Sequence, residues 1–403
     1  MANSLLTIDM ITKECLRLAH EKASFLGTIN RQFDSSFGAS NGKIGDTLRI
    51  RLPSQYTRRQ GSRTYSAQNA VERSTPLVNS TQDGVDMKFN SRELTLDLEN
   101  FSKQHLEPAM ATLVSGIESD VLQGVTKKVW NVAGTAGTPP TDLVAIGQAR
   151  AKLNQGLAPK DGNRYVQMDS VTMGGMVNGL KGLFQDSTQI KEQYREGMIG
   201  RTGMADWYEN ERVWTLSNSS DVTGTTDAAA LVTDGGSTVD MKTTVAAPAV
   251  GSVFTIAGVY ACHPETKAAY SHLQQFTILT TSAGAAVTVA PTIYLTGASK
   301  NVSSSTGANL ATTDFNSKAL TFIGAASTSY VQNLMYHKDA FTFVTAELPI
   351  MADSTKCVVQ KYDNLSLRVW QASDITSDEL LTRIDILYGY AAIRPEWACR
   401  ITS

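Results

Sequence analysis

The stretch SKQHLEPAMATLVSGIESDVLQGVTKKVWNVA, residues Ser102 to Ala133, repeats apolar side chains at steps of three and four. The repeating positions are Leu106, Met110, Leu113, Ile117, Val121, Val125 and Val129, and the charged positions off that face include Glu118, Lys127 and Lys128. This spacing predicts a helix with one apolar face. A helix of this length spans about 45 Å, so we interpret it as a spine that carries separate units; an ordinary long core helix is the alternative. Pro108 allows two starts, either Ser102 as N-cap followed by a kink or a start near Glu107.

Length and composition limit the class of protein. The 403 residues suffice for two or three domains, each with its own core. A hydrophobic fraction of 42% and a charged fraction of 18% are typical of a folded protein with a weakly charged surface. The net charge of -2 argues against a basic face that grips nucleic acid. No apolar run approaches the roughly 18 residues that cross a bilayer, and the first residues lack the basic region of a secretion signal, so we expect synthesis in a cytoplasm and no membrane partner.

No motif in the sequence predicts catalysis, a cofactor or a metal. A Walker A loop, a GxSxG elbow and an HExxH motif are absent, and turns explain the glycines of 197–203 better than a dinucleotide site does. Cys262-His263 with His272 nearby comes closest to a metal cluster, but no second Cys or carboxylate stands at ligand spacing. The cysteines lie far apart in sequence and are predicted to be buried free thiols: Cys15, Cys262, Cys357 and Cys399.

The amino-terminal part predicts a helix followed by a long β-excursion. Leu5 to Phe25 form an amphipathic pattern with Leu5, Ile8, Ile11, Cys15, Leu18 and Ala19 on one face. This helix packs within its own chain or reaches a neighbouring subunit. Thr47–Leu52 alternates as a strand, and Arg92–Leu98 alternates again as the returning strand.

Between these two strands lies a polar segment, Gln55 to Gly84, that is much longer than an ordinary loop. It carries the arginines Arg58, Arg59, Arg63 and Arg73. We interpret it as an arm that docks on an acidic patch of another subunit through these four arginines. The alternative is a solvated, flexible hairpin.

The next part predicts a small α/β unit. After the break at 134–140, Thr141 can cap a helix with Leu143, Ile146, Leu153 and Leu157 on one side, and Gly156 helps to end it. Arg164–Met168 follows as a short strand, and Ser170 to Phe184 as a helix. Four glycines in this second helix lower its stability by roughly 1 kcal/mol each relative to Ala, so we expect close helix contacts or a bend there.

The segment Ser217 to Lys318 is rich in Thr, Ser, Ala and Gly and shows short alternating strands at 253–256, 275–278 and 287–289. Two polar runs, SNSSDVTGTTD and ASKNVSSSTGAN, are interpreted as linkers. We predict an inserted β-domain that folds independently and is exposed on its host. Its predicted core is Val253, Phe254, Ile256, Phe276, Ile278, Val287, Val289, Ile293 and Leu295.

From Ser327 the host of this insertion resumes, and its last part is predicted to form return strands. Leu365–Trp370 and Arg383–Tyr390 alternate as strands, and 394–401 ends the chain in a third, which we expect to be intolerant of truncation. Asp385 and Glu396 lie in these strands, where we expect salt bridges rather than acid–base chemistry.

The order of arm, spine helix, α/β unit and closing strands resembles the capsid fold of tailed bacteriophages. Four stretches are similar to P22-like coat proteins: 163–169 (NRYVQMD), 194–208 (YREGMIGRTGMADWY), 332–341 (QNLMYHKDAF) with 347–349 (ELP), and 383–396 (RIDILYGYAAIRPE). The resemblance implies an α+β fold of the HK97 type with an inserted all-β domain. The implied division is 1–42 for the N-terminal helix and arm, 43–100 for the extended β-hairpin arm, 101–140 for the spine helix of the P-domain, 141–216 for part of the A-domain, 217–320 for the inserted domain, and 321–403 for the return strands.

This resemblance also implies a function and partners. It implies a major capsid protein that assembles with itself as pentamers and hexamers around a scaffolding protein and a portal, with room for a decoration protein. The shell of the virion would enclose double-stranded DNA without sequence-specific binding, which the slight negative charge favours. No enzyme activity and no cofactor are expected. The competing class is a β-rich, adhesin-like surface protein, which should show a secretion signal and β-repeats.

Overall fold

The computed structural model describes residues 8–32, 47–59, 61, 68–69, 72–90, 105–180, 201–220, 223–227, 232–242, 247–281, 286–350, 356–362, 365–374 and 379–403. The chain divides into two compact units, each built from segments that are far apart in sequence. Unit 1 comprises Met1–Ile50, Thr75–Val121 and Phe341–Ile393, and unit 2 comprises Arg51–Ser74, Leu122–Ala340 and Arg394–Ser403. The six-part division that the resemblance implies is finer than these two units and stays a proposal.

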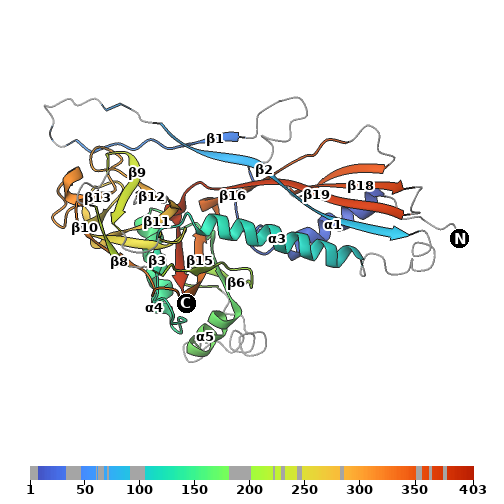
Figure 1. The fold of residues 1–403 in the computed structure, drawn as a ribbon, viewed down its shortest axis with the longest axis horizontal. Helices are drawn as coiled ribbons and strands as arrows, with labels where there is room; N and C mark the ends of the chain where they lie inside the picture. Colours follow the sequence, from blue (N-terminus) through green and yellow to red (C-terminus); the bar gives the residue numbers. More distant parts are fainter. Residues whose placement is uncertain are drawn as a thin grey trace. The chain divides into compact units, whose positions relative to one another are not determined.

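Unit 1 is a sheet with two helices along one face (Figure 1). The strand order is β1-β2-β19-β18-β17, and β16 also pairs with β19. The strands are β1 (Thr47–Leu52), β2 (Arg73–Asn90), β16 (Phe341–Ala346), β17 (Lys356–Tyr362), β18 (Leu365–Asp374) and β19 (Glu379–Ala392). The helices are α1 (Ile8–Lys22) and α3 (Glu107–Thr126). The predicted strands at 47–52, 365–370 and 383–390 are therefore confirmed.

The strand that returns from the arm is β2, which begins at Arg73. The predicted loop Gln55 to Gly84 is therefore wrong from Arg73 onward, and the predicted return strand Arg92–Leu98 lies outside the described residues. The reason is tertiary, because β2 pairs antiparallel with β19 from Asn79 to Asn90 although its sequence is mostly polar. At Gly84 an added Cβ would stand 2.6 Å from the carboxylate of Asp385, so this register needs a glycine there.

The spine helix α3 begins at Glu107, the later of the two predicted starts, and ends at Thr126. The predicted extension to Ala133 is wrong. After Thr126 the main chain tightens, with Lys128 N donating to Val125 O and Val129 N to Thr126 O. Val132 and Ala133 then form a short strand, β3. The predicted apolar positions are nevertheless all buried: Leu106, Met110, Leu113, Ile117, Val121, Val125 and Val129.

The prediction that Glu118 lies on the charged face of α3 is wrong. Its side chain is fully buried. Its carboxylate accepts hydrogen bonds from Ser24 Oγ at 3.0 Å and from the main-chain N–H of Phe25. It therefore fastens the turn after α1 to the spine helix, and the apolar stripe alone could not reveal this.

Helix α1 packs within its own chain, against β17 and β18. The described members of its predicted apolar face are buried, namely Ile11, Cys15, Leu18 and Ala19. Leu5 lies outside the described residues, as does the side chain of Ile8. One of the two open interpretations of this helix, packing within the chain, is thus observed.

Unit 2 contains a second sheet, with the order β3-β20-β15-β4-β6-β5 and β7 paired to β15, and it is mixed because β3 and β20, and β4 and β6, pair parallel. Its strands are β3 (Val132–Ala133), β4 (Arg164–Met168), β5 (Arg201–Thr202), β6 (Ala205–Glu209), β7 (Thr215–Ser217), β15 (Ser329–His337) and β20 (Ala398–Thr402). Short 3-10 turns, η4 (Lys338–Ala340) and η5 (Pro395–Trp397), adjoin β15 and β20. We refer to this part as the host sheet.

Two helices pack on the host sheet, α4 (Leu143–Gln155) and α5 (Ser170–Leu180). The N-cap of α4 is Asp142, which accepts from Val144 N, so the predicted cap Thr141 is wrong by one residue. Ile146 and Leu153 are buried as predicted, but Leu157 is exposed and itself adopts the left-handed conformation after the helix, with φ 61°. The predicted extension of α5 to Phe184 lies outside the described residues.

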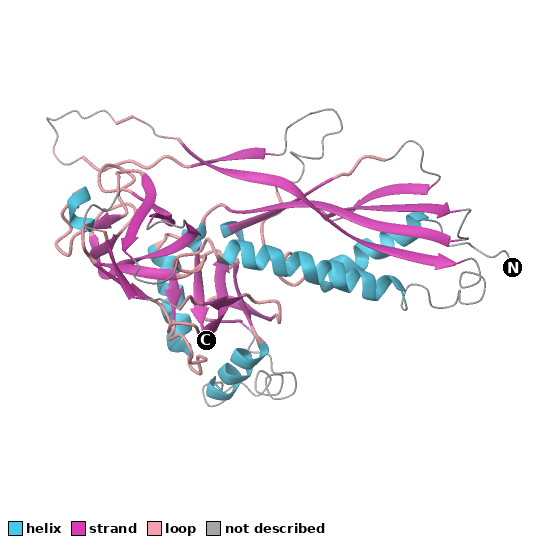
Figure 2. Cartoon of the chain, in the orientation of Figure 1, coloured by secondary structure: helices cyan, strands magenta, loops and turns pink. Residues whose placement is uncertain are grey.

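The other part of unit 2 is a β-barrel made by residues 223–322. Its strands are β8 (Thr223–Thr226), β9 (Gly236–Lys242), β10 (Val253–Cys262), β11 (Ala269–Thr281), β12 (Ala286–Ile293), β13 (Val302–Ser303) and β14 (Ala319–Phe322). The order is β11-β12-β9-β8-β14-β10, the pairing of β10 with β11 closes the ring, and β13 also pairs with β10. Figure 2 shows the described residues of this part as strands and loops with the short 3-10 turn η3 (Thr312–Phe315).

The barrel core matches the prediction and its ends do not. All nine predicted core residues are buried. The predicted end at Lys318 omits β14, and the predicted linker ASKNVSSSTGAN contains β13, so this run is an internal part of the barrel. Ser217, the predicted first residue, belongs to β7 and pairs with the host strand β15.

Candidate functional site

The arm is the segment between β1 and β2, residues 53–72, of which 53–59, 61, 68–69 and 72 are described. The side chain of Gln68 on one leg forms two hydrogen bonds with the main chain of Thr57 on the other leg, as a paired strand would. Thr57 N donates to Gln68 Oε1 at 2.8 Å, and Gln68 Nε2 donates to Thr57 O at 2.7 Å. At the base, the exposed Arg51 and Glu72 lie 3.6 Å apart. The arm therefore has defined local structure although little of it is buried.

The structure separates the four arginines that the sequence groups together. Arg58 and Arg59 are both exposed on one leg of the arm, and Arg63 lies outside the described residues. Arg73 is half-buried at the first residue of β2. Burial lowers the pKa of Lys267, and the nearby positive charge of Arg73 lowers it further, which places Arg73 close to the barrel of its own chain. Contact of these arginines with another subunit stays a prediction.

Sequence reasoning missed Tyr56 in this arm. Its side chain is 58% exposed, two residues before Arg58. Tyr and Arg are the residue types most enriched among the energetically dominant residues of protein interfaces. The available signal was an aromatic residue inside a run, Ser54-Gln-Tyr-Thr-Arg-Arg59, that has no other apolar side chain.

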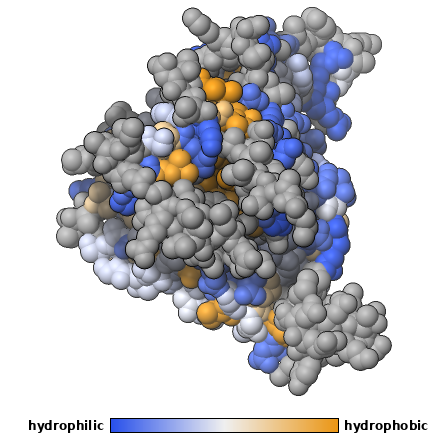
Figure 3. Space-filling model, turned by 90° about the vertical axis from the view of Figure 1, so that its right-hand side faces the viewer, coloured by the Kyte–Doolittle hydropathy of each residue, from blue (hydrophilic) through white to orange (hydrophobic). Residues whose placement is uncertain are grey.

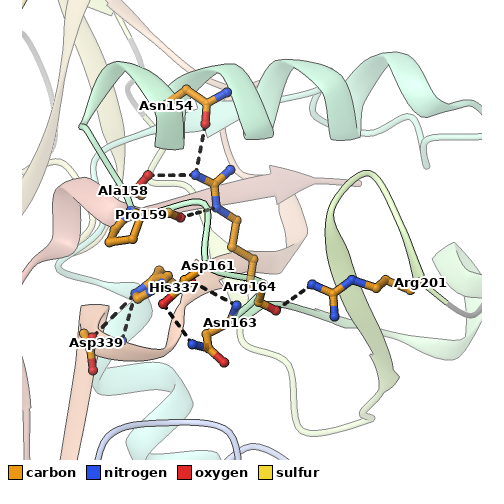
Figure 4. A network of polar contacts seen from close by, with 10 residues as sticks. Asn154, Ala158, Pro159, Asp161, Asn163, Arg164, Arg201, His337 and Asp339 are labelled. Carbon is orange, nitrogen blue, oxygen red and sulfur yellow. Dashed lines mark hydrogen bonds and ion pairs between the residues drawn. The ribbon is translucent and has the colours of Figure 1, made fainter.

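A buried polar network lies where the loop after α4 meets the end of β15 (Figure 4). His337 is 1% exposed, and its Nε2 lies 3.0 Å from Asp161 Oδ1. The main-chain N–H of Asp339 donates a hydrogen bond to His337 Nδ1 at 3.2 Å. The ring hydrogen of His337 is therefore on Nε2, which donates a hydrogen bond to Asp161. The ring of His337 meets Trp397 edge to face at 5.4 Å.

Asp161 gives this network a dependence on pH. Burial would raise the pKa of Asp161, but hydrogen bonds from Asn163 and His337 outweigh it and lower the pKa to about 2. The unfolded-state value is about 3.9, so the carboxylate stabilises the folded chain above pH 4, and this contribution is lost as pH falls from 4 to 2.

We therefore expect Asp161→Asn to flatten the pH dependence of the unfolding free energy between pH 4 and pH 2, measured by urea denaturation. Because 44% of the Asp161 side chain is exposed, solvent screening keeps the expected difference below about 1 kcal/mol. An unchanged slope in this pH range would contradict the assignment.

Arg164 closes the other side of the network. Its fully buried guanidinium donates from Nε to Pro159 O at 3.0 Å and from Nη2 to Ala158 O at 2.8 Å and Asn154 Oδ1 at 3.0 Å. These acceptors belong to the carboxyl end of α4 and the loop after it, where a cation is favoured. Two of the stretches that resemble coat proteins, 163–169 and 332–341, thus supply the buried Arg164 and His337 of this network.

The two histidines near Cys262 in sequence, His263 and His272, have different surroundings. His263 Nδ1 accepts main-chain N–H groups of Glu265 at 3.1 Å and Thr266 at 3.2 Å, so it caps a turn. Burial, and then the charge of Lys152, lower the pKa of His272 to about 4. Within the described ranges, no group of three or more His, Cys, Asp or Glu side chains could hold a metal ion.

The cysteines form no disulfide. Cys15, Cys262 and Cys399 are buried free thiols as predicted, and Cys357 is half-buried. Burial raises the pKa of both Cys15 and Cys399 to about 12, so neither is a reactive thiolate at neutral pH.

Asp385 forms the predicted salt bridges. Its fully buried carboxylate lies 2.6 Å from Arg368 Nη2 and 2.7 Å from Arg383 Nε. For Glu396, the described residues show no ion pair. Glu396 lines a cavity of about 130 Å³ together with Lys152 and His272, and burial raises its pKa.

The surface drawn in Figure 3 carries hydrophobic residues in small groups between hydrophilic ones. Among the described residues, none of the helices combines the length and the hydropathy of a membrane-spanning segment.

Similar structures come from phage and virus-like particles. A structure titled "Mycobacterium phage Che8" matches with a TM-score of 0.48 and 11% identity, covering 94% of this chain and 90% of that one. The capsid of Ralstonia phage GP4 matches with a TM-score of 0.48 and 8% identity, covering 93% and 87%. A virus-like particle from Pyrococcus furiosus matches with a TM-score of 0.40 and 7% identity, covering 98% of each chain.

No curated protein sequence matches the chain. The sequence model described as "P22 coat protein - gene protein 5" matches residues 36–400, which is nearly the whole chain. The match includes the arm, the spine helix, the barrel and the buried network, and members of this family are structural proteins rather than enzymes. The chain therefore belongs to the P22 coat protein family: it is a major capsid protein of a tailed phage, with the HK97-type fold, and builds the icosahedral shell of the virion with copies of itself.

Proposed function

We propose that the chain assembles as pentamers and hexamers around a scaffolding protein and a portal, and that the arm supplies a contact to the neighbouring copy. The observation that carries the arm assignment is its exposed leg, where Tyr56, Arg58 and Arg59 are presented on a segment braced by Gln68. Arg63 is proposed to join them. Arg73 is assigned to the base of the arm, because it is half-buried near Lys267 of its own chain.

The enclosed double-stranded DNA is proposed to be held without sequence-specific contacts. A net charge of -2 gives the shell little attraction for phosphate. A decoration protein is an additional partner in this proposal.

Expression of the chain with and without a scaffolding protein tests the assembly proposal. We expect closed particles in electron micrographs and megadalton species on sedimentation when the scaffold is present. A chain that sediments only as a monomer or small oligomer under these conditions would contradict the proposed assembly around a scaffold.

The triple change of Arg58, Arg59 and Arg63 to Glu is expected to abolish particle assembly while leaving the subunit folded. An exposed ion pair contributes about 0–1 kcal/mol, so Arg58→Glu alone should be nearly silent, but three reversals repeated in every copy of a shell add up. Sedimentation measures assembly, and circular dichroism measures folding. Normal assembly of the triple variant, or loss of its folded state, would rule out this role of the arm.

We also propose that the inserted barrel is a separate folding domain on the exposed side of the shell. Its support is a buried cluster of its own, which includes Val239, Phe254, Phe276 and Phe315. Because β14 ends at Phe322, the fragment 217–324 is a better choice than 217–320. This fragment is expected to give dispersed amide resonances and cooperative unfolding. Collapsed resonances typical of a disordered chain would show that the host is required.

A further inference from the structure

Arg400 joins three parts of unit 2 at one point. It lies on β20 of the host sheet and is fully buried. Its Nη1 donates to Gly251 O at 2.6 Å, and its Nη2 donates to Thr277 Oγ1 at 3.0 Å and to Lys127 O at 3.2 Å. Gly251 and Thr277 belong to the barrel segment, whereas Lys127 directly follows α3. One guanidinium group on the host sheet therefore binds the barrel and the segment that directly follows α3, all within unit 2.

Two side chains of β11 complete this joint from the barrel side. Thr277 Oγ1 donates to Lys127 O at 3.0 Å, and two residues earlier Gln275 pairs with the main chain of Val132. Val132 N donates to Gln275 Oε1 at 2.9 Å, and Gln275 Nε2 donates to Val132 O at 3.1 Å. The side chain of Gln275 thus forms the two hydrogen bonds with β3 that a neighbouring strand would form. Gln275 and Thr277 point to the same side of β11, because residues two apart on a strand share a face.

The main chain at Gly251, which accepts from Arg400, has a conformation and surroundings that require glycine. Its φ of +91° is a conformation that favours glycine, and an added Cβ would collide with the ring of Trp214. The same ring lies 5.6 Å from the guanidinium of Arg400 and 5.5 Å from Lys127 Nζ. The joint is therefore closed over by an aromatic side chain, which keeps water from the cation.

The acceptors of Arg400 are neutral, because they are two carbonyl oxygens and one hydroxyl. Arg400 is fully buried, and this burial lowers its pKa. If the barrel moved away from the host sheet, the cation would lose the Gly251 and Thr277 acceptors. A buried charge that loses its hydrogen bonds is strongly destabilising.

We infer that Arg400 couples the barrel to the host sheet, so that the two open as one cooperative unit although the barrel has a core of its own. Arg400 is a positioning residue: it holds the barrel in one orientation through Gly251 and Thr277. This coupling is independent of the proposed arm contact. The result of an assembly experiment therefore neither supports nor contradicts the role of Arg400.

Native-state hydrogen exchange on the full-length, unassembled chain tests this inference. In the unchanged protein, protected amides of β10–β11 and of β15–β20 should open together, with protection factors that agree within about threefold. In Arg400→Met the two sets should separate, with the host sheet opening about tenfold or more faster than the barrel. Thr277→Val is the milder variant, since it removes the shared hydroxyl and keeps the shape of the side chain.

The matched control is Thr226→Val, which removes a buried hydroxyl whose bonds to Phe315 O and Lys318 N stay inside the barrel. It should raise exchange in both sets by the same factor, because the joint is intact. Independent opening in the unchanged protein would overturn the inference. An equal rise of both sets in Arg400→Met and in Thr277→Val would also overturn it, since a merely structural role produces that result.

Discussion

A chain that lacks residues 398–403 is expected to lose the folded host sheet. These residues include β20, which lies between β15 and β3 and whose five residues are all buried. Replacement of a buried Ile such as Ile401 by Ala alone costs about 2–5 kcal/mol of folding free energy. The deletion also removes the hydrogen-bonded partner of β15 from Gln332 to Tyr336. The loss is comparable to the whole stability of a typical domain, about 5–15 kcal/mol.

The measurement is soluble yield and urea unfolding of the truncated chain beside the full-length protein. Deletion of Ser403 alone is the control, because this residue is half-buried and its main-chain N–H donates to Val331 O. The control should fold with a modest loss of stability. A truncated chain with the same unfolding midpoint as the full-length protein would show that β20 is dispensable.

Asp385→Ala is expected to destabilise unit 1 by about 3–5 kcal/mol. Removal of one partner from a buried ion pair leaves an uncompensated charge, and here Arg368, whose side chain is only 6% exposed, would be left without its carboxylate. Arg368 also donates from Nη1 to Pro349 O at 3.1 Å, which cannot replace the lost charge. Arg383 is 49% exposed and can turn to solvent.

The matched control is Asp86→Ala in the neighbouring strand of the same sheet. Asp86 is 75% exposed and lies 3.7 Å from Arg383, so its removal should cost less than about 1 kcal/mol. Equal effects of the two changes on the urea midpoint would contradict the assignment of Asp385. Gly84→Ala should weaken the sheet at the same place, because the added Cβ meets the Asp385 carboxylate.

The predictions that succeeded rest on local periodicity. The apolar spacing of α3 identified seven side chains that are all buried, and the alternation in the insertion identified nine. These patterns predict burial correctly because a helix or a strand turns one set of side chains toward a core, and this holds for any core. The burial of Val129 shows the limit of the argument, since it is reached after the helix has ended.

The predictions that failed concern residues whose partners lie far away in the chain. The polar strand β2 was predicted in part as a loop, because its pairing with β19 bridges about three hundred residues. Glu118 was placed on the charged face, because its partners are the main chain of Phe25 and the hydroxyl of Ser24. No window of the sequence around either residue contains its partner.

The candidate site shows the same division. Composition alone singled out the arm and its arginines, but it grouped Arg73 with Arg58 and Arg59, which the structure separates by burial. Arg400 could not be recognised at all, because a single arginine in an apolar terminal strand resembles an edge residue. Its three acceptors come from segments that are joined only by the fold.

The sequence by itself determined the family, the apolar face of the spine helix, and the core of the barrel. Each of these depends on residue types and spacings that are local or that match the family model. The tertiary structure alone decided where the spine helix ends, which strand returns from the arm, and how the barrel is joined to the host sheet. The physical reason is that these features depend on hydrogen bonds made by buried polar groups, whose cost is acceptable only when a distant partner is brought into place.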